Sequence, residues 1–183
     1  MSSAVILYGP PASGKDTVTD ALTAADSAYA LFRRLKVGSG RTGTYRMTTS
    51  DQIDALRSSG EILWENARYE AVYVVDRPEL NEMLSGRTIP VLHLGQVESI
   101  DAIRTGVPEV QWTTVELWCP REVAETRIRD RGTNDTAARL AAWDATDRLA
   151  PNQADLRIDT SRHTPAESAE MIRQAVESQC PST

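Results

Sequence analysis

Apolar positions along this chain alternate between short unbroken runs and longer stretches of helical spacing. Residues 4–8 form an uninterrupted apolar run, which is typical of a parallel strand covered on both faces. In residues 14–25 apolar side chains recur with the period of a helix, and Gly9 lies between the two segments. The beginning of the chain therefore predicts a strand, a glycine loop and a helix.

The same alternation continues to the end of the chain. We expect further strands at 88–94, 110–119 and 156–159, and helices at 51–57, from 77, at 97–103, 120–131 and 134–149, and from 164. Ser50 is the expected cap of the helix at 51–57. Residues 29–35 form a second apolar stretch, and the Gly-, Ser-, Thr- and Arg-rich segment 36–49 predicts a loop or a small subdomain. This pattern indicates an α/β fold with a mostly parallel sheet, helices on both faces, and ligands beyond the carboxyl ends of the strands.

The composition narrows the class of protein. At 183 residues, with 40% hydrophobic and 25% charged residues, the chain is expected to fold as one globular domain. No apolar run approaches the ~20 residues that span a bilayer, so we expect a cytoplasmic protein without a membrane partner. The net charge of -6 argues against a general nucleic-acid binder, and a phosphate ligand would need locally concentrated Arg and Lys. Cys119 and Cys180 lack metal-ligand spacing and are expected to be free thiols.

The glycine loop matches the phosphate-binding pattern of two glycines five residues apart followed by lysine. In this pattern the glycines let backbone N–H groups and the start of the helix face the phosphates of ATP, while the lysine reaches the terminal phosphates. A tight turn without a ligand is the alternative, but it does not account for the order of strand, glycines, lysine and helix. The residues expected to bind ATP are Gly9, Ala12, Ser13, Gly14, Lys15, Asp16 and Thr17.

Asp16 stands where serine or threonine is usual in this pattern. A carboxylate close to phosphates costs electrostatic energy unless a cation intervenes. Asp16 therefore implies Mg²⁺, bound directly or through water, with the Thr17 hydroxyl as the alternative ligand. In the first helical turn, Asp16 would also complement the helix dipole without any metal.

Four arginines gather at positions 127, 129, 131 and 139. Arginines on a closable segment can neutralise the charge of a transferring phosphoryl group while excluding water. Alternatively they form a solvated helix face, since Arg127 and Arg131 lie four residues apart and acidic residues are nearby.

These motifs together resemble the guanylate kinase family. The resemblance rests on the glycine loop, on the stretch from Tyr45 to Tyr73, and on Arg131-Gly-Thr followed by Arg139-Leu, and it covers most of the chain. It implies a P-loop NTPase three-layer fold with a core at 1–35 and 86–183, an acceptor-binding insert at about 36–85 and an arginine lid at about 128–142. It also implies an acceptor-phosphate site made of Tyr45, Tyr73, Arg34, Lys36 and Arg41, and lid roles for Arg131 and Arg139.

The sequence departs from the guanylate kinase pattern where that family reads guanine. The family uses one carboxylate just before a tryptophan and another at the end of the third strand, whereas here the order is Trp64-Glu65 and residues 91–96 contain no acid. Without these carboxylates, the chain lacks the acceptors by which that family recognises guanine through hydrogen bonds. Glu65 is the preferred reader of the acceptor, and His93 is either an acceptor contact or base, or a packed strand residue.

We therefore expect an ATP-dependent phosphotransferase with Lys15, Arg131 and Arg139 as catalytic residues and a nucleoside monophosphate as acceptor. The Lys-Asp pair of the loop and Leu63-Trp64 are similar to ribose 1,5-bisphosphate phosphokinases, so a sugar phosphate is the alternative acceptor. A guanylate-kinase-like binding module without activity is a third hypothesis. Both a monomer and a homodimer are compatible with the sequence.

Overall fold

The main sheet of the protein is parallel throughout. The computed structural model describes residues 2–39, 42–68, 70–132 and 135–179. The strands, in spatial order, are β2 (Tyr29–Leu31), β7 (Ile89–Leu94), β1 (Ser3–Tyr8), β8 (Gln111–Trp118) and β9 (Leu156–Asp159). Each neighbouring pair runs parallel, so all strands end at the same edge of the sheet. The predicted α/β fold is confirmed.

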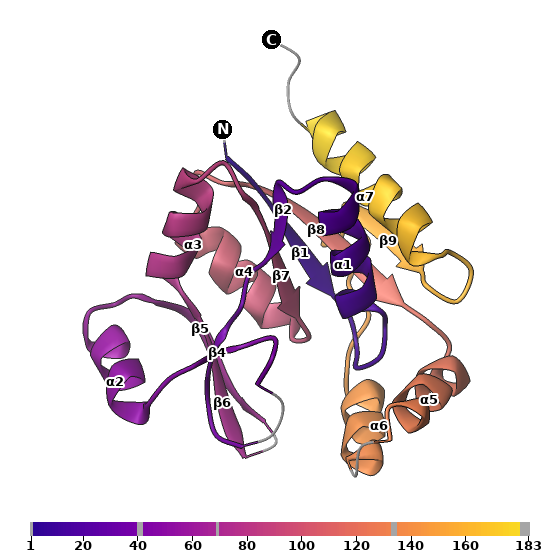
Figure 1. Cartoon of the computed structure of the whole chain (residues 1–183), viewed down its shortest axis with the longest axis horizontal. Helices are drawn as coiled ribbons and strands as arrows, with labels where there is room; N and C mark the ends of the chain where they lie inside the picture. Colours follow the sequence, from indigo (N-terminus) through magenta and orange to yellow (C-terminus); the bar gives the residue numbers. More distant parts are fainter. Residues whose placement is uncertain (1, 40–41, 69, 133–134, 180–183) are drawn as a thin grey trace.

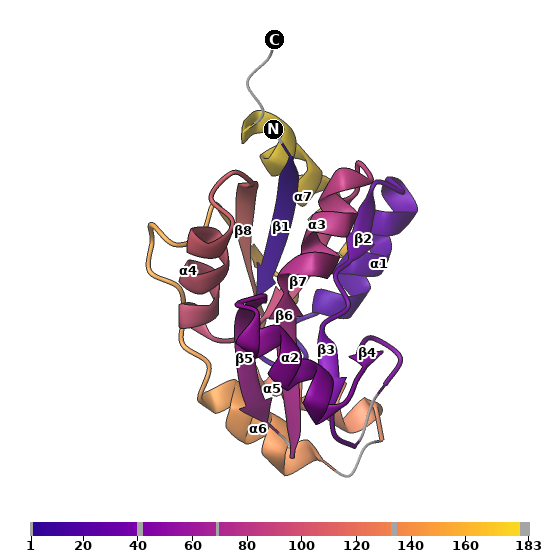
Figure 2. The same cartoon turned by 90° about the vertical axis from the view of Figure 1, so that its left-hand side faces the viewer.

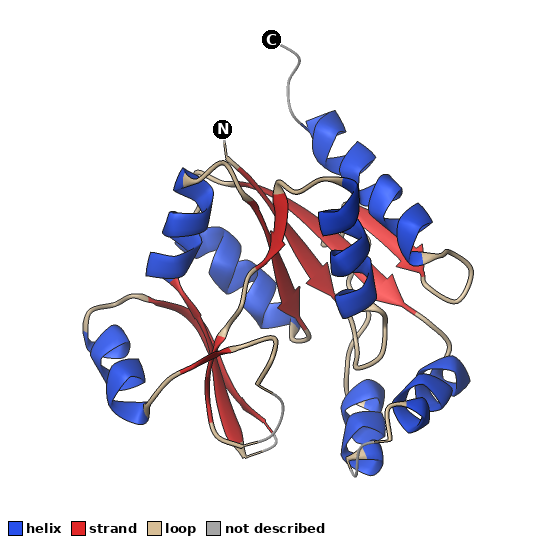
Figure 3. Cartoon of the chain, in the orientation of Figure 1, coloured by secondary structure: helices blue, strands red, loops and turns tan. Residues whose placement is uncertain are grey.

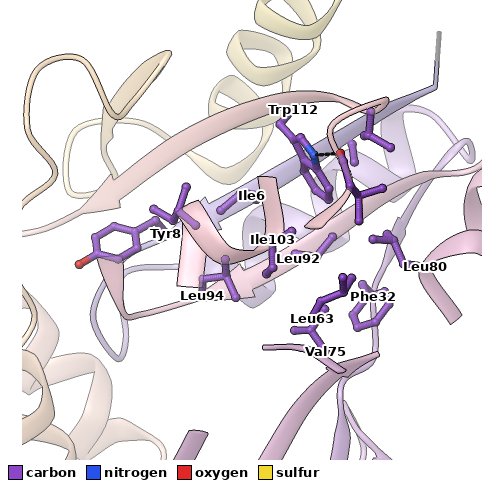
Figure 4. Close-up of a cluster of buried hydrophobic side chains, with 14 of the residues drawn as sticks. Ile6, Tyr8, Phe32, Leu63, Val75, Leu80, Leu92, Leu94, Ile103 and Trp112 are labelled. Carbon is purple, nitrogen blue, oxygen red and sulfur yellow. Dashed lines mark hydrogen bonds between the residues drawn. The ribbon is translucent and has the colours of Figure 1, made fainter. Parts of the chain in front are cut away.

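Helices cover both faces of this sheet (Figure 3). Val5 and Leu7 of β1 pack with α1 (Lys15–Ala25) and α7 (Pro165–Gln179) on one face. Ala4, Ile6 and Tyr8 face the other way, toward α3 (Arg77–Ser85) and α4 (Val97–Gly106), where Leu80 and Ile103 complete a second core (Figure 4). The unbroken apolar run in β1 is therefore explained by burial on both faces.

A second, four-stranded sheet follows β2 in the chain and forms the insert. Its elements are β3 (Leu35–Val37), β4 (Arg46–Met47), α2 (Ser50–Ser58), β5 (Ile62–Arg68) and β6 (Ala71–Asp76). The strand order is β4-β3-β6-β5, and β6 pairs antiparallel with both β3 and β5. Helix α2 covers one face of this sheet, because Ile53 packs against Leu35 and Val74.

Two further helices, α5 (Arg121–Asp130) and α6 (Thr136–Asp144), form a hairpin after β8. Figure 1 shows that the insert and this hairpin both extend from the end of the main sheet toward which β1 runs, and Figure 2 shows the same arrangement from the insert side. The glycine loop therefore lies between two projecting substructures. Among the described residues, no helix has the length and apolar character needed to cross a bilayer.

Several boundaries differ from the sequence expectations. Segment 36–49 contributes β3 and β4 to the small sheet, and the β5–β6 hairpin was not expected from the sequence. Helix α3 lies within the span expected for the insert, yet it packs on the main sheet through Leu80. The expected cap Ser50 is instead the first helical residue, and the side chain of Thr49 accepts the capping hydrogen bond from the Gln52 N–H. The helix expected at 134–149 is shorter, ending at Asp144.

Candidate active site

The glycine loop joins β1 to α1 and requires glycine at two positions. A Cβ atom on Gly9 would lie 2.2 Å from the backbone oxygen of Leu117 on the neighbouring strand, so no side chain fits there. Gly14 has φ = 97°, a left-handed conformation that glycine adopts without steric cost, and it caps the start of α1. The backbone thereby turns its N–H groups and the positive end of α1 toward the space beyond the sheet, which is an anion-binding arrangement.

Lys15 lies folded back against this loop. Its Nζ donates hydrogen bonds to the carbonyl oxygens of Gly9 at 2.6 Å and Pro10 at 2.8 Å, and it lies 3.4 Å from the Ser13 hydroxyl. Burial lowers the pKa of Lys15 to about 7; Asp16 opposes this shift, while Arg34 and Arg131 add to it. An anion placed among these cations would restore the charge on Lys15.

Arg127 holds the loop from behind. Its guanidinium donates to the Ala12 carbonyl at 3.1 Å and to the Thr160 carbonyl at 2.7 Å. The Thr160 hydroxyl in turn donates to the Ser13 carbonyl at 2.9 Å. Ala12, which has φ = 63°, packs with Ile128 of α5. Helix α5 therefore fixes the loop in a conformation that a non-glycine residue rarely adopts.

A pocket in the described part of the chain lies in front of this loop and gathers side chains from the core, the insert and the α5–α6 hairpin. Its basic residues are Lys15, Arg34, Arg68, Arg131 and Arg139, and Asp16 is its one acidic residue. The protein has a net charge of -6, so this concentration of positive charge is local. Such a pocket attracts a strongly anionic ligand.

The insert contributes an aromatic pair to the pocket. Tyr45 and Tyr73 both line it, with ring centroids 5.2 Å apart, and Arg34 lies over both rings at 5.8 and 5.2 Å. Lys36 does not line the pocket: it is buried against the same two rings, and its Nζ donates to the Ser39 carbonyl at 2.5 Å. Of the expected basic trio, only Arg34 faces the pocket, and Arg41 lies outside the described residues.

Strand β5 presents Asn66 and Arg68 to the pocket, not Glu65. The Glu65 carboxylate accepts two hydrogen bonds from Arg57 of α2, at 3.2 and 2.8 Å, on the opposite side of the sheet. The structure therefore places Glu65, the expected reader of the acceptor, outside the pocket, and its neighbour Asn66 lines the pocket instead. The Asn66 Oδ1 atom is buried without a hydrogen-bond partner, a state that a ligand donor would relieve.

The four arginines near residue 130 separate into different positions. Arg131 and Arg139 line the pocket, Arg127 supports the loop, and Arg129 points to solvent and pairs with Glu125 at 2.5 Å. Arg139 also pairs with Asp135 at 2.7 Å. Arg131 and Arg139 thus lie at positions compatible with the lid interpretation, whereas Arg129 has the exposure that the solvated-face interpretation expects.

A buried ion cluster anchors the chain where it returns from α6. The Glu116 carboxylate on β8 accepts two hydrogen bonds from Arg148, both at 3.0 Å, and one from the Leu149 N–H at 2.8 Å, and it also pairs with Arg157. Burial alone would raise the pKa of Glu116, but the hydrogen bonds from Arg148 and Leu149 hold it below the ordinary value. Tyr8 adds a hydrogen bond to the Asp147 carbonyl at 2.7 Å. The α5–α6 hairpin is consequently tied to the core at both ends.

The family model described as chloramphenicol phosphotransferase-like protein matches residues 2–177. The chain belongs to this family. Members of the chloramphenicol phosphotransferase-like family are P-loop kinase-like phosphotransferases, in agreement with the glycine loop and the parallel sheet. No curated protein matches the sequence.

Solved structures similar to this family member are P-loop kinases. A guanylate kinase from Anaplasma phagocytophilum aligns over 100% of this chain and 88% of that chain, with 17% identity and a TM-score of 0.63. A sugar kinase from Janibacter sp. HTCC2649 aligns over 97% and 95%, with 19% identity and a TM-score of 0.59. A gluconokinase from Sinorhizobium meliloti 1021 aligns over 96% and 90%, with 18% identity and a TM-score of 0.54. At these identities the likeness establishes the fold, and the expected resemblance to guanylate kinases holds at that level.

P-loop kinases typically use Mg²⁺, and the residues of this family member fit that ion in part. Asp16 offers a carboxylate to the pocket next to the space for phosphates, which suits an ion that takes one or two carboxylates and completes its shell with phosphates and water. The Thr17 hydroxyl is exposed, donates to the Gly14 carbonyl at 3.0 Å and does not line the pocket. Within the described ranges, no three His, Cys, Asp or Glu side chains form a metal cluster.

Sequence reasoning missed five polar residues among the described lining of the pocket, namely Thr44, Asn66, Arg68, Gln96 and Thr146. The spacing of Asn66 and Arg68 is the two-residue period of a strand, so recognition of β5 in the sequence would have grouped them. No sequence pattern indicated that Arg127 and Thr160 bond to each other and support the loop, because these two residues lie 33 positions apart.

Proposed function

We propose that this protein transfers the terminal phosphoryl group of ATP to a small acceptor that already carries a phosphate. The observation that carries the proposal is the arrangement of the pocket: Arg34, which precedes the insert, and Tyr45 and Tyr73 of the insert line the same basic cavity as the glycine loop and Lys15. Two anion-binding walls opposite one another suit a donor polyphosphate on one side and an acceptor phosphate on the other.

The acidic content of the pocket supports a phosphate as the nucleophile. An acceptor hydroxyl must lose a proton during transfer and needs a base, whereas a phosphate oxygen is already ionised near neutral pH. Among the pocket residues that the structure describes, Asp16 is the sole carboxylate and belongs to the loop, and His93 is the sole imidazole and is engaged by Thr19 and Asp16. In the proposed reaction an acceptor phosphate oxygen forms the new P–O bond, the bond between the terminal phosphorus and the bridging oxygen breaks, and ADP leaves with that oxygen.

Each wall then has a role in this transfer. Lys15 and the loop N–H groups would hold the donor phosphates, and Arg34 with the two tyrosines would orient the acceptor phosphate. Arg131 and Arg139 would stabilise the charge that spreads over the transferred group. Bound Mg²⁺ would supply further charge neutralisation, with Asp16 as its protein ligand.

The identity of the acceptor beyond its phosphate is the finer part of the proposal. A nucleoside monophosphate is our first candidate, because the guanylate kinase fold extends over the whole chain. A specific observation favours a sugar phosphate as the second candidate: the wall of the pocket formed by Asn66, Arg68 and Gln96 offers amides and a guanidinium and no carboxylate. These groups can donate to the oxygen atoms of a sugar, and the Asn66 Oδ1 atom can accept from a sugar hydroxyl, which both donates and accepts.

An acceptor screen tests both levels of the proposal. ADP release from Mg-ATP would be followed with the common nucleoside monophosphates, with sugar monophosphates and bisphosphates, and with the parent nucleosides and sugars as controls. We expect turnover with at least one phosphate-bearing compound and none with its unphosphorylated parent. Turnover with the parent compounds alone would refute the phosphate nucleophile, and ATP binding without any turnover would favour a binding module.

A further inference from the structure

His93 lies where the carboxyl end of β7 meets the first turns of α1. Its side chain is 13% exposed and lines the pocket beside Asp16. The Nε2 atom is 2.7 Å from the Thr19 hydroxyl, and the Nδ1 atom is 3.5 Å from Oδ1 of Asp16. The imidazole ring therefore connects two residues of α1 that lie on the same helix face.

Thr19 determines how the ring is held. Its side chain is buried, and its hydroxyl donates to the Lys15 carbonyl at 2.9 Å. Nδ1 can hold the Asp16 carboxylate only as an N–H donor, so in the neutral ring Nε2 accepts from the Thr19 hydroxyl, whose proton is then shared between Nε2 and the Lys15 carbonyl. With Nε2 engaged in this way, Nδ1 is the ring atom that faces the Asp16 carboxylate.

Asp16 has several competing partners in this pocket. Arg34 and Arg131 lie close enough to Lys15 to lower its pKa, and Asp16 lies close enough to raise it. A short carboxylate among several cations can turn toward any of them, so its direction depends on fixed neighbours. The His93 ring, held by Thr19, is such a neighbour on the side of the main sheet.

We propose that His93 is a positioning residue which, anchored by Thr19, keeps the Asp16 carboxylate turned toward the site of the metal and the donor phosphates. The proposal rests on the proposed function, because it assigns Asp16 to the magnesium complex of ATP. It accounts for a polar residue at the end of an otherwise apolar strand, and for the hydroxyl of a buried threonine that faces that strand. His93 does not transfer a proton in this scheme.

The test is a double-mutant cycle that reads metal dependence. Thr19→Val keeps the side-chain shape and removes the hydroxyl, His93→Gln keeps an acceptor for Thr19 and removes Nδ1, and Asp16→Asn removes the ligand charge. For each variant we would measure ATP affinity in EDTA, ATP affinity against Mg²⁺ concentration, and binding of Mn²⁺ to the ATP complex by electron paramagnetic resonance. Loss of a group that orients a metal ligand costs roughly 10–100-fold in metal affinity.

We expect Thr19→Val and His93→Gln each to raise the Mg²⁺ concentration for half-maximal ATP binding by roughly tenfold. ATP affinity in EDTA should stay within about twofold, and neither change should add to the effect of Asp16→Asn. Thr19→Ser, which keeps the hydroxyl, should show the metal dependence of the unaltered protein. His163→Gln, at the other histidine of the chain, should have no effect.

Unchanged metal dependence in both Thr19→Val and His93→Gln would overturn the proposal, as would effects that add to Asp16→Asn. If Thr19→Val unfolds, His93→Gln alone decides the outcome. Absence of ATP binding by the unaltered protein would instead count against the proposed function, so the two failures are distinguishable.

Discussion

The two walls of the pocket are built in different ways. The loop wall comes from nine consecutive residues, 9–17, and its contacts are local, such as those of Lys15 with the carbonyls of Gly9 and Pro10. The insert wall comes from the segment before β4 and from strands β5 and β6. Asn66 on β5 lies opposite Tyr73 on β6, and Tyr73 lies opposite Lys36 on β3, which packs behind the wall against the tyrosine rings.

The neighbouring row of the small sheet shows how much the insert wall depends on register. Leu35, Val74 and Glu65 are paired in the same way one residue along, and Leu35 and Val74 face α2. A shift of pairing by one residue exchanges the two faces of a strand. Local order thus specifies the loop wall, whereas cross-strand pairing specifies the insert wall, and substitutions should affect the two walls differently.

The largest expected effect is at the loop wall. Lys15→Ala should lower kcat by at least about 10²-fold, because it removes a charged donor from the phosphates at the moment of transfer. The free energy of unfolding should fall by about 1–3 kcal/mol, because Gly9 and Pro10 are buried and their carbonyls lose a donor. Steady-state kinetics and thermal unfolding of the same preparation check both parts. Near-normal turnover of a folded variant would contradict the role of this wall.

A smaller effect is expected at the α5–α6 hairpin, where the chain offers a matched pair. Arg131→Ala should lower kcat by roughly 10²-fold, as for loss of one transition-state donor. Arg129→Ala removes the same type of side chain two residues away, but Arg129 points to solvent, so kcat should stay within about twofold. Equal losses in the two variants would argue that general charge, and not position, matters in this segment.

The insert wall should respond in KM more than in kcat. Asn66→Ala should raise the KM of the acceptor by about tenfold, the value of one hydrogen bond of about 1.4 kcal/mol. Glu65→Ala, on the opposite face of β5, should leave the KM unchanged. A raised KM in Glu65→Ala with an unchanged KM in Asn66→Ala would contradict this prediction. It would mean that β5 pairs in the other register in solution and that Glu65 contacts the acceptor.

At neutral pH the smallest effect concerns protons, because a Lys15 with a pKa of about 7 is still about half charged there. The pKa of Lys15 is lowered to about 7 in the free protein by burial, and bound phosphates should raise it toward the ordinary value of a lysine. The complex then binds more protons than the free protein between pH 7 and about 10, so affinity for ATP should fall as pH rises, by at most about tenfold per pH unit. Calorimetry in EDTA, with buffers of different ionisation enthalpy, should detect proton uptake near pH 8. Lys15→Ala should abolish it.

The sequence predicted the features that depend on near neighbours. The strand, the loop and the start of α1 were located to within a residue or two, and Lys15 and Asp16 were placed together because they are adjacent. The pocket positions of Arg131 and Arg139 were expected from a family resemblance, and the structure brings both toward Lys15. Prediction was weakest in the insert, where the β5–β6 hairpin was not anticipated and Lys36 was expected in the pocket.

By itself, the order of residues determined the parallel sheet and the phosphate loop, because backbone conformation and hydrophobic period are properties of short segments. Only the tertiary structure decided which face of β5 looks into the pocket, that Arg127 supports the loop, and that His93 joins Thr19 to Asp16. These contacts join residues tens of positions apart, and their partners are chosen by strand register and helix packing, which no single segment encodes.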